Sequence, residues 1–232
     1  MKKAVILLSG GLDSTTVLFR AIAAGYSCYA LSFDYGQRHR RELMAAQEIA
    51  QLGSVVEHQV VRFDLGAWGG SALTDLAIAL PEHRSLETMG QGIPVTYVPA
   101  RNTIFLSFAL GYAEAIAATE VHIGVNALDY SGYPDCRGDY IEAMQRVYEL
   151  GTKQGREGRP IQIITPLIDR SKGDIIQLGN ELGVPWEKTW SCYSQGVGEN
   201  PVRACGVCDS CQLRLAAFAA LGLKDPLPYA LA

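Results

Sequence analysis

The stretch that decides the fold is LLSGGLDSTT, residues 7–16. It follows an apolar run at residues 4–8 and leads into residues 17–22, where apolar side chains recur with a helical period. This order predicts a strand, a tight glycine turn and a helix, an arrangement that aims backbone N–H groups at a phosphate. The lysine of the common nucleotide loop, G-x-x-x-x-G-K-[ST], is absent. The stretch therefore predicts a phosphate loop that works without that lysine.

The same alternation continues along the chain and predicts an α/β fold. Strand-like runs alternate with helix-like stretches, so we expect a parallel five-stranded sheet with helices on both faces. Ligands of such sheets bind outside the carboxyl ends of the strands, where the motifs described below fall. The predicted strands are residues 4–8, 28–33, 55–63, 121–125 and 161–164, and the predicted helices are residues 14–24, 40–52, 103–118, 139–150 and 172–182.

Two segments depart from this alternation. Residues 64–99 contain several glycines and prolines but no long periodic element, and long loops in compact domains are often functional. We expect a lid over the active site, with a passive insertion as the alternative. Residues 186–232 contain four of the six cysteines. The predicted organisation is an ATP-binding α/β domain at residues 1–185, with the insertion, and a metal-binding C-terminal segment at residues 186–232 packed on it.

Composition and charge narrow the class of protein. The 232 residues are 48% hydrophobic and carry a formal net charge of −4, which fits a globular protein better than a dedicated nucleic-acid binder. The apolar run near the N-terminus is short and meets Ser9 without a signal-peptidase pattern. No run approaches the length of a membrane span. We expect a cytoplasmic protein that binds neither nucleic acid nor membranes.

The residues of the phosphate loop suit a nucleotide and its metal ion. Gly10 and Gly11 allow a positive φ and a close approach of phosphate, and the helix start adds its dipole. Asp13 would repel a phosphate unless a divalent cation lay between them, so we assign it to Mg²⁺ bound with ATP. The alternative is a capped glycine turn without a ligand. The predicted ATP-binding residues of this loop are Leu8, Ser9, Gly10, Gly11, Leu12, Asp13, Ser14 and Thr15.

The string S-G-G-x-D-S, residues 9–14, resembles the PP-loop of the ATP pyrophosphatase superfamily. The resemblance implies a Rossmann-like fold of the adenine nucleotide α-hydrolase type. It also implies that the loop grips the β- and γ-phosphates as the leaving group, leaving the α-phosphorus open to attack. That role explains why the lysine is absent. In the common nucleotide loop, the lysine serves transfer of the γ-phosphoryl group.

Two further motifs fit the superfamily. DYGQRHRRE, residues 34–42, follows the second predicted strand and supplies Gln37 and Arg38 for ATP, with His39 as the one histidine in a position to serve a site. IDRSKGDII, residues 168–176, places Lys172 at a helix start, where the resemblance implies a phosphate contact and the alternative is a solvated charge. The remaining histidines are scattered, and His122 is expected in the core.

Two motifs after the insertion carry candidate substrate contacts. Arg101 and Asn102 begin a strongly apolar helix, and a guanidinium recognises carboxylate or phosphate with two hydrogen bonds. The loop GVNALDYSGYPDCR, residues 124–137, predicts a pocket for a flat heteroaromatic ring, with a plain surface loop as the alternative. Cys136 has no histidine nearby in the sequence, so we disfavour a nucleophilic role. The candidate residues of the loop are Asn126, Asp129, Tyr130, Ser131, Gly132, Tyr133, Asp135 and Arg137.

Four cysteines near the end of the chain predict a metal centre. Cys192, Cys205, Cys208 and Cys211 have the spacing C-x12-C-x2-C-x2-C, which is typical of a tetrahedral zinc site. The alternative is an iron–sulfur cluster, but the fourth position of the ferredoxin pattern is Leu215. Four protein ligands leave no open coordination position, so the zinc is expected to be structural.

Together the motifs resemble the 7-cyano-7-deazaguanine synthase family of queuosine precursor biosynthesis over nearly the whole chain. The resemblance implies a ligase that joins 7-carboxy-7-deazaguanine and ammonia, using ATP, through an adenylated carboxylate and then an adenylated amide. It also implies a homodimer. No second domain is long enough to be a glutaminase, so free ammonia, or ammonia from a partner, is expected.

Two other functions stay open at this point. A tRNA-modifying PP-loop enzyme, a thiolase or a lysidine-type ligase, would activate a base in the same way, but the acidic balance and the lack of an RNA-binding module disfavour it. The other open function is a non-catalytic sensor that binds ATP and zinc. A sensor of this kind would bind the nucleotide without releasing pyrophosphate.

Overall fold

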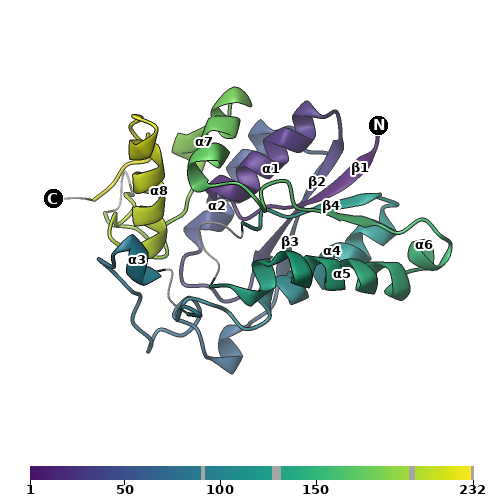
Figure 1. Ribbon diagram of the computed structural model, residues 1–232, viewed down its shortest axis with the longest axis horizontal. Coiled ribbons are helices and arrows are strands. Elements are labelled where there is room, and N and C mark those ends of the chain that lie inside the picture. Colours follow the sequence, from purple (N-terminus) through teal and green to yellow (C-terminus); the bar gives the residue numbers. More distant parts are fainter. Residues whose placement is uncertain (90–91, 127–131, 199–201, 231–232) are drawn as a thin grey trace.

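The computed structural model describes residues 1–89, 92–126, 132–198 and 202–230. Its centre is one parallel sheet in the order β3-β2-β1-β4-β5, covered on both faces by helices (Figure 1). The predicted five-stranded parallel sheet is confirmed. Its strands are β1 (Lys3–Leu7), β2 (Ser27–Asp34), β3 (Glu57–Arg62), β4 (Glu120–His122) and β5 (Gln162–Ile164).

Each predicted helix is present, with ends shifted by a few residues. The structure adds short helices and one longer helix, α8, which the sequence analysis missed inside the cysteine segment. The helices are α1 (Leu12–Ala23), α2 (Arg41–Leu52), α3 (Leu86–Met89), α4 (Arg101–Ala115), α5 (Gly138–Gly151), α6 (Lys153–Arg156), α7 (Lys172–Glu181) and α8 (Asp209–Ala220), with single turns η1 (Gly66–Trp68), η2 (Pro134–Cys136) and η3 (Trp186–Lys188).

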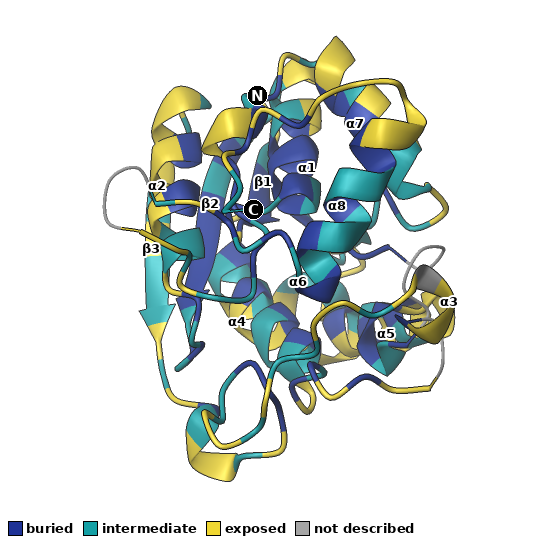
Figure 2. Cartoon of the chain, turned by 90° about the vertical axis from the view of Figure 1, so that its left-hand side faces the viewer, coloured by how far each residue is buried: buried dark blue, intermediate teal, exposed yellow. Residues whose placement is uncertain are grey.

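The central strand shows why both faces are covered. Side chains alternate along β1, so Ala4 and Ile6 join the core under α1, α2 and α7, while Val5 and Leu7 join the core under α4 and α5. All four are buried, and the burial view shows the central strands in dark blue between helices with exposed outer faces (Figure 2). A parallel strand that is buried on both faces has a continuous apolar sequence, as residues 4–8 have.

The strand order fixes where a ligand can bind. The chain builds outward from β1 through β2 to β3 and then returns to place β4 on the other side of β1. The loops after β1 and β4 therefore leave the sheet in opposite directions, which opens a crevice at the carboxyl ends of the strands. The PP-loop follows β1, and residues 124–137 follow β4. Gly124 lies so close to the PP-loop that an added Cβ would meet the backbone of Asp13 and Ser14 at 3.2 Å.

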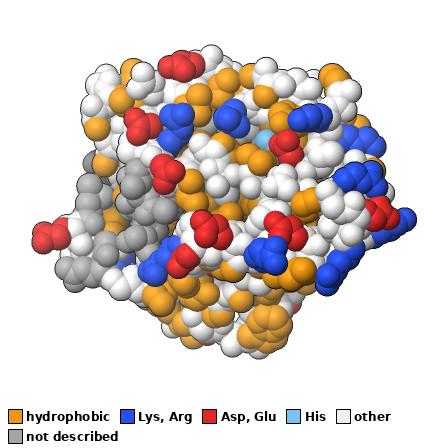
Figure 3. All heavy atoms as spheres, turned by 45° about the vertical axis from the view of Figure 1, so that its right-hand side comes forward, with side chains coloured by type: hydrophobic (Ala, Val, Ile, Leu, Met, Phe, Trp, Pro, Cys, Tyr) orange, Lys and Arg blue, Asp and Glu red, His pale blue; other side chains and the backbone are white. Residues whose placement is uncertain are grey.

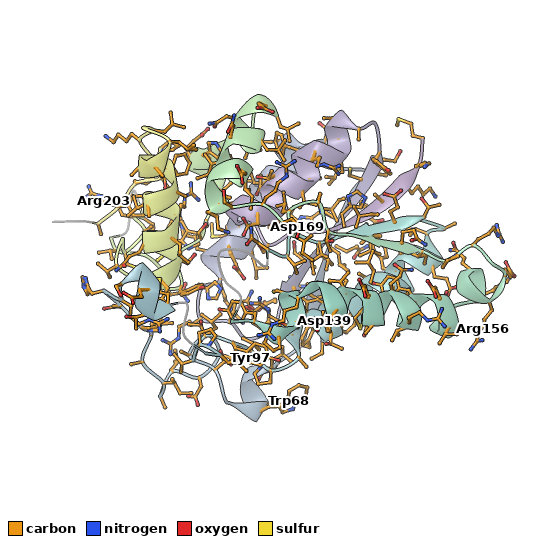
Figure 4. The ribbon with its side chains drawn as sticks, in the orientation of Figure 1. Trp68, Tyr97, Asp139, Arg156, Asp169 and Arg203 are labelled. Carbon is orange, nitrogen blue, oxygen red and sulfur yellow. The ribbon has the colours of Figure 1, made fainter. Side chains whose placement is uncertain are left out.

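The insertion at residues 64–99 is tied to the C-terminal segment. The N–H of His83 donates to the carbonyl of Val207 (2.9 Å), and Arg84 Nε donates to Asp209 Oδ1 (3.1 Å). In its described residues, 64–89 and 92–99, the insertion contains only η1 and α3 as helices, and α3 lies beside α8 in Figure 1. At its other end, Trp68 projects from η1 at the edge of the molecule and is 72% exposed (Figure 4).

The C-terminal segment shares a core with the sheet. Phe218 of α8 packs in the same apolar cluster as Ile175 of α7. Arg214, also from α8, is buried and donates to Asp225 through Nε (2.7 Å) and to the carbonyl of Trp186 (2.9 Å). Buried charges are tolerated in proteins when they are paired and hydrogen-bonded in this way.

The surface carries charge of both signs. On the face drawn in Figure 3, lysines and arginines alternate with aspartates and glutamates among apolar side chains. Within the described ranges, every helix is too short or too polar to pass through a lipid bilayer.

Candidate active site

The PP-loop crosses α2 at a position that only glycine can occupy. Gly10 has a φ of +82°, and a Cβ there would lie 2.4 Å from the amide nitrogen of Ala46 and 2.5 Å from the carbonyl oxygen of Glu42. The carbonyl of Gly10 also accepts a hydrogen bond from the N–H of Trp190 (2.8 Å). The loop is therefore held between α2 and the C-terminal segment.

Hydroxyl groups set the internal shape of the loop. Ser9 Oγ and Ser14 Oγ share a hydrogen bond (3.0 Å), and Thr15 donates to the carbonyl of Gly11 (2.7 Å). Helix α1 begins at Leu12, and the first N–H groups of a helix have no partner within it. The loop thus presents backbone donors and serine hydroxyls at the positive end of a helix dipole, which favours a phosphate there.

The predicted metal and phosphate residues face each other. Lys172 Nζ lies 2.9 and 2.8 Å from the two carboxylate oxygens of Asp13. Lys172 is the first residue of α7, and Ser171 and Asp174 fix this helix start with reciprocal side-chain-to-backbone hydrogen bonds. A carboxylate suits a divalent cation and an ammonium suits phosphate oxygens, so these two side chains could hold a magnesium-bound triphosphate between them.

Arg101 brings a positive charge to the other side of the same cavity. It follows Ala100, whose left-handed φ of +53° turns the chain into α4. Its guanidinium lies 3.5 Å from the Tyr35 hydroxyl and 5.9 Å from the ring centre of Phe105. Burial raises the pKa of Tyr35 to about 12, so its hydroxyl stays neutral. Among the described residues Arg101 forms no ion pair, which leaves its charge available to an anionic ligand.

The start of α4 also organises the loop after β4. Asp135 Oδ2 accepts from the N–H of Asn102 (3.0 Å), and Asn102 Nδ2 donates to the carbonyl of Asp135 (3.0 Å) and to Cys136 Sγ (3.3 Å). Asp135 therefore caps a helix instead of lining the cavity. Burial, with a smaller contribution from Asp135, raises the pKa of Cys136 to about 11 and keeps the thiol protonated. The neutral thiol agrees with the sequence argument against a nucleophile.

These groups surround one cavity of about 310 Å³ at the carboxyl ends of β1, β2 and β4. A volume of this size is typical of small-molecule sites. The predicted residues that line it are Leu8, Ser9, Gly11, Leu12, Asp13, Ser14, Arg101, Asn102, Asn126, Tyr133 and Lys172. The predicted residues placed outside its lining are Gly10, Thr15, Gln37, Arg38, Gly132, Asp135 and Arg137. Asp129, Tyr130 and Ser131 lie outside the described residues.

Two predicted ATP contacts have other roles in this structure. Gln37 is buried, accepts from the N–H of Tyr35 (2.8 Å) and donates to the carbonyl of Phe33 (3.0 Å), which shapes the turn after β2. Arg38 reaches into the insertion and donates to the carbonyls of Asp75 (2.7 Å) and Ile78 (3.2 Å). Their assignment to ATP stays a prediction that these contacts do not support.

The cavity also has lining residues that the sequence analysis missed. Tyr35 and Glu42 come from the motif after β2, whose other members were noticed, so their position was the available signal. Trp190, Ser191 and Tyr193 come from the segment around the first cysteine. Nothing in their spacing points to a cavity that is built mainly by the first half of the chain.

The four cysteines lie close enough to hold one metal ion. The sulfur atoms of Cys192, Cys205, Cys208 and Cys211 are all within 4.8 Å of one another. Four ligands placed tetrahedrally at the usual Zn–S distance of about 2.3 Å are about 3.8 Å apart, and the separation between Cys205 Sγ and Cys211 Sγ is 3.9 Å. Hydrogen bonds from the other three thiols lower the pKa of Cys205 and favour its thiolate. The donor set fits a single thiophilic ion.

The fold and cavity define the class of protein: an α/β protein with a PP-loop at the crevice of a parallel sheet. Residues 3–222 match the family described as Queuosine biosynthesis protein QueC. The chain is 72% identical over 227 residues to the 7-cyano-7-deazaguanine synthase of Cyanothece sp. (strain PCC 7425 / ATCC 29141), covering 98% of this chain and 99% of that relative. It is 73% identical over 229 residues to that of Thermosynechococcus vestitus (strain NIES-2133 / IAM M-273 / BP-1), covering 99% and 96%. The chain belongs to the QueC family, as its motifs predicted.

Proposed function

We propose that this chain is an ATP-dependent ligase that converts 7-carboxy-7-deazaguanine and ammonia into 7-cyano-7-deazaguanine. The observation that carries the proposal is the single cavity shared by the PP-loop, Lys172 and Arg101. One side of this cavity suits a triphosphate and the other suits a carboxylate, so both reactants can meet there. Family membership and the names of the relatives support the choice of substrate.

In the first step, the carboxylate at one side of the cavity reacts with the ATP at the other side. A carboxylate oxygen attacks the α-phosphorus of ATP, the bond to the β-phosphate oxygen breaks, and pyrophosphate leaves. Donors of the PP-loop and Lys172 stabilise the charge that develops on pyrophosphate, because such preorganised donors act strongly in a site that excludes water. Arg101 holds the carboxylate against the α-phosphorus by a two-point contact. The product is an acyl adenylate.

The later steps replace oxygen by nitrogen. Ammonia attacks the acyl carbon and AMP leaves, which gives the amide. The amide oxygen then attacks the α-phosphorus of a second ATP, and a second pyrophosphate leaves. Loss of AMP and of both N–H protons from this adenylate gives the nitrile. Adenylation is required twice, because carboxylate and amide oxygens are poor leaving groups whereas AMP is a good one.

Two metal ions belong to the proposal. Asp13 is the residue to ligate Mg²⁺ bound to ATP, since a carboxylate at a phosphate site needs a cation between them. The four cysteines hold a structural Zn²⁺, which supplies no reacting group and fixes the segment that carries Trp190 and Tyr193.

The remaining expectations also stay part of the proposal. They are a homodimer, a cytoplasmic location, a lid at residues 64–99, and the division into an ATP-binding domain (residues 1–185) and a zinc-binding segment (residues 186–232). Hydrogen bonds from His83 and Arg84 to the C-terminal segment support a lid that closes against that segment.

The test is an assay of pyrophosphate release with ATP, Mg²⁺ and ammonium, with and without the acid, with the base product read by mass. We expect release only with the acid, together with nitrile. Release that depends on tRNA instead would favour an RNA-modifying enzyme. ATP binding without any release would favour a sensor.

A further inference from the structure

The last residues of the insertion contact a tyrosine that lines the cavity. Thr96 Oγ1 shares a hydrogen bond with the hydroxyl of Tyr133 (2.8 Å). Thr96 is completely buried and lies outside the cavity lining, whereas Tyr133 is part of that lining. Thr96 comes from the insertion at residues 64–99 and Tyr133 from the loop after β4, so the hydrogen bond joins two segments. The steps above give Thr96 no role.

The same two segments pack together beside this hydrogen bond. A Cβ on Gly132 would lie 2.8 Å from the carbonyl oxygen of Gly92 and 2.9 Å from Pro94 Cδ, so the close approach depends on glycine. The ring of Tyr97 lies 6.0 Å from the ring of Tyr133. The end of the insertion is therefore packed directly against the part of the loop that carries Tyr133.

Tyr133 belongs to the end of the cavity that suits the acid. Tyr133 and Arg101 both line the cavity, and they lie close enough to interact electrostatically. Tyr193, from the cysteine segment, also lines the cavity and forms a side-chain hydrogen bond with Tyr133. Three segments thus meet at one aromatic ring near the guanidinium that is proposed to bind the carboxylate. Such a ring offers a face on which a flat heteroaromatic base can stack.

We propose that Thr96 is a positioning residue for the acid: it holds the hydroxyl of Tyr133 and so keeps the ring where the deazapurine stacks against it. This inference rests on the proposed function. A side chain that is fixed before a ligand arrives loses less freedom on binding, so the ligand binds more tightly. The insertion therefore takes part in recognition of the acid, although Thr96 lies outside the cavity lining.

A second threonine–tyrosine pair provides a matched control. Thr103 Oγ1 shares a hydrogen bond with the hydroxyl of Tyr140 (2.9 Å). Neither of these residues lines the cavity. Thr103→Val therefore removes the same type of hydrogen bond, with the same change of side chain, without releasing a ring of the cavity wall.

The test measures the responses to the acid and to ATP separately. Exchange of labelled pyrophosphate into ATP, with the acid and without ammonium, needs adenylation alone, and it yields a half-saturating concentration for each reactant. Thr96→Val leaves the hydroxyl of Tyr133 facing a methyl group, which is unfavourable at a buried position. We expect the half-saturating concentration of the acid to rise about 10-fold, the order of a lost contact between a base and an aromatic ring. The half-saturating concentration of ATP and the maximal rate should not change, and Thr103→Val should leave all three values unchanged.

Two more variants show whether Thr96 acts through Tyr133. Thr96→Ser keeps the hydroxyl, so its half-saturating concentration of the acid should equal that of the wild type. Tyr133→Phe removes the phenol oxygen and should raise this concentration at least as far as Thr96→Val does. Adding Thr96→Val to Tyr133→Phe should then cause no further rise, because two changes that remove one interaction are not additive.

The opposite results would overturn the inference. They are an unchanged half-saturating concentration of the acid in Thr96→Val, an equal rise for ATP, or a further rise in the double variant. If Thr96→Val does not fold, Tyr133→Phe carries the test, and a wild-type value for the acid in that variant overturns the inference. If the wild-type protein lacks exchange that depends on the acid, the proposed function itself fails.

Discussion

Substituting Gly10 by alanine tests whether the PP-loop is held where it can activate ATP. The φ of Gly10 is +82°, and the left-handed region costs other residues roughly 1–2 kcal/mol. The new Cβ would also lie 2.4 Å from the amide nitrogen of Ala46, a contact with backbone that no side-chain rotation can relieve. The loop must therefore move by about 1 Å, the difference between 2.4 Å and the 3.4 Å at which ordinary contact begins.

Gly25 supplies the matched control for this substitution. Its φ is +80°, and a Cβ there meets nothing within 4 Å, so Gly25→Ala carries the backbone strain without the clash. For a chain of this size, each kcal/mol lowers Tm by roughly 2–4 °C. Both variants should melt below the wild type, and Gly10→Ala should melt lower than Gly25→Ala.

The activity of the two variants should differ more than their stability. A misplacement of about 1 Å in a catalytic group costs on the order of 100-fold in rate. We expect pyrophosphate exchange that depends on the acid to fall by about that factor in Gly10→Ala and to be unchanged in Gly25→Ala. Equal exchange in the two folded variants would refute the claim that α2 fixes the loop.

Three further predictions concern the acid, the metal and pH. Arg101→Lys removes the two-point contact with the carboxylate, so the KM for the acid should rise about 10-fold or more while ATP binding is kept. An unchanged KM for the acid would show that Arg101 does not bind the carboxylate. Chelation of the metal, or Cys205→Ser, should lower Tm and loosen the PP-loop, because Trp190 holds that loop by a hydrogen bond. Hydrogen exchange of the backbone amides at residues 9–14 should then become faster. Unchanged amide exchange there would show that the metal does not stabilise the loop. Burial lowers the pKa of His58 and of His122, so both side chains are neutral in the folded protein. The free energy of unfolding should therefore fall as pH drops below about 6.5, because there the unfolded chain takes up protons that the folded chain does not. In urea titrations at several pH values, His58→Asn should make the free energy of unfolding depend less on pH.

The sheet was predictable because its signals are local. Strands β1 and β2 are largely buried apolar runs, and helices such as α1 and α5 carry apolar side chains at helical spacing. Helix α8 was missed because its first turn contains Cys211 and the metal spacing dominated the interpretation. Its partners, Ile175 of α7 and Asp225 beyond it, are tertiary neighbours that one sequence does not reveal.

The candidate site likewise contains residues that the sequence predicts and residues that it does not. The PP-loop is contiguous in the sequence, so residues 9–14 were found as a string. Glu42 and Tyr193 reach the cavity from a helix start and from the cysteine segment, and no spacing rule joins such positions. Asp135 shows the converse: a carboxylate in a polar loop predicts a ligand contact, whereas in this structure its oxygen accepts from the N–H of Asn102. Its contact with substrate stays a prediction.

The central claim is that the acid is activated by transfer of AMP to its oxygen, and oxygen labelling tests it most directly. The purified protein would receive 7-carboxy-7-deazaguanine labelled with ¹⁸O in the carboxylate, together with ATP, Mg²⁺ and ammonium. Each activation should move one labelled oxygen into AMP, so both AMP molecules formed per nitrile should carry ¹⁸O, and pyrophosphate should carry none. Label in inorganic phosphate with formation of ADP, or unlabelled AMP, would contradict the account.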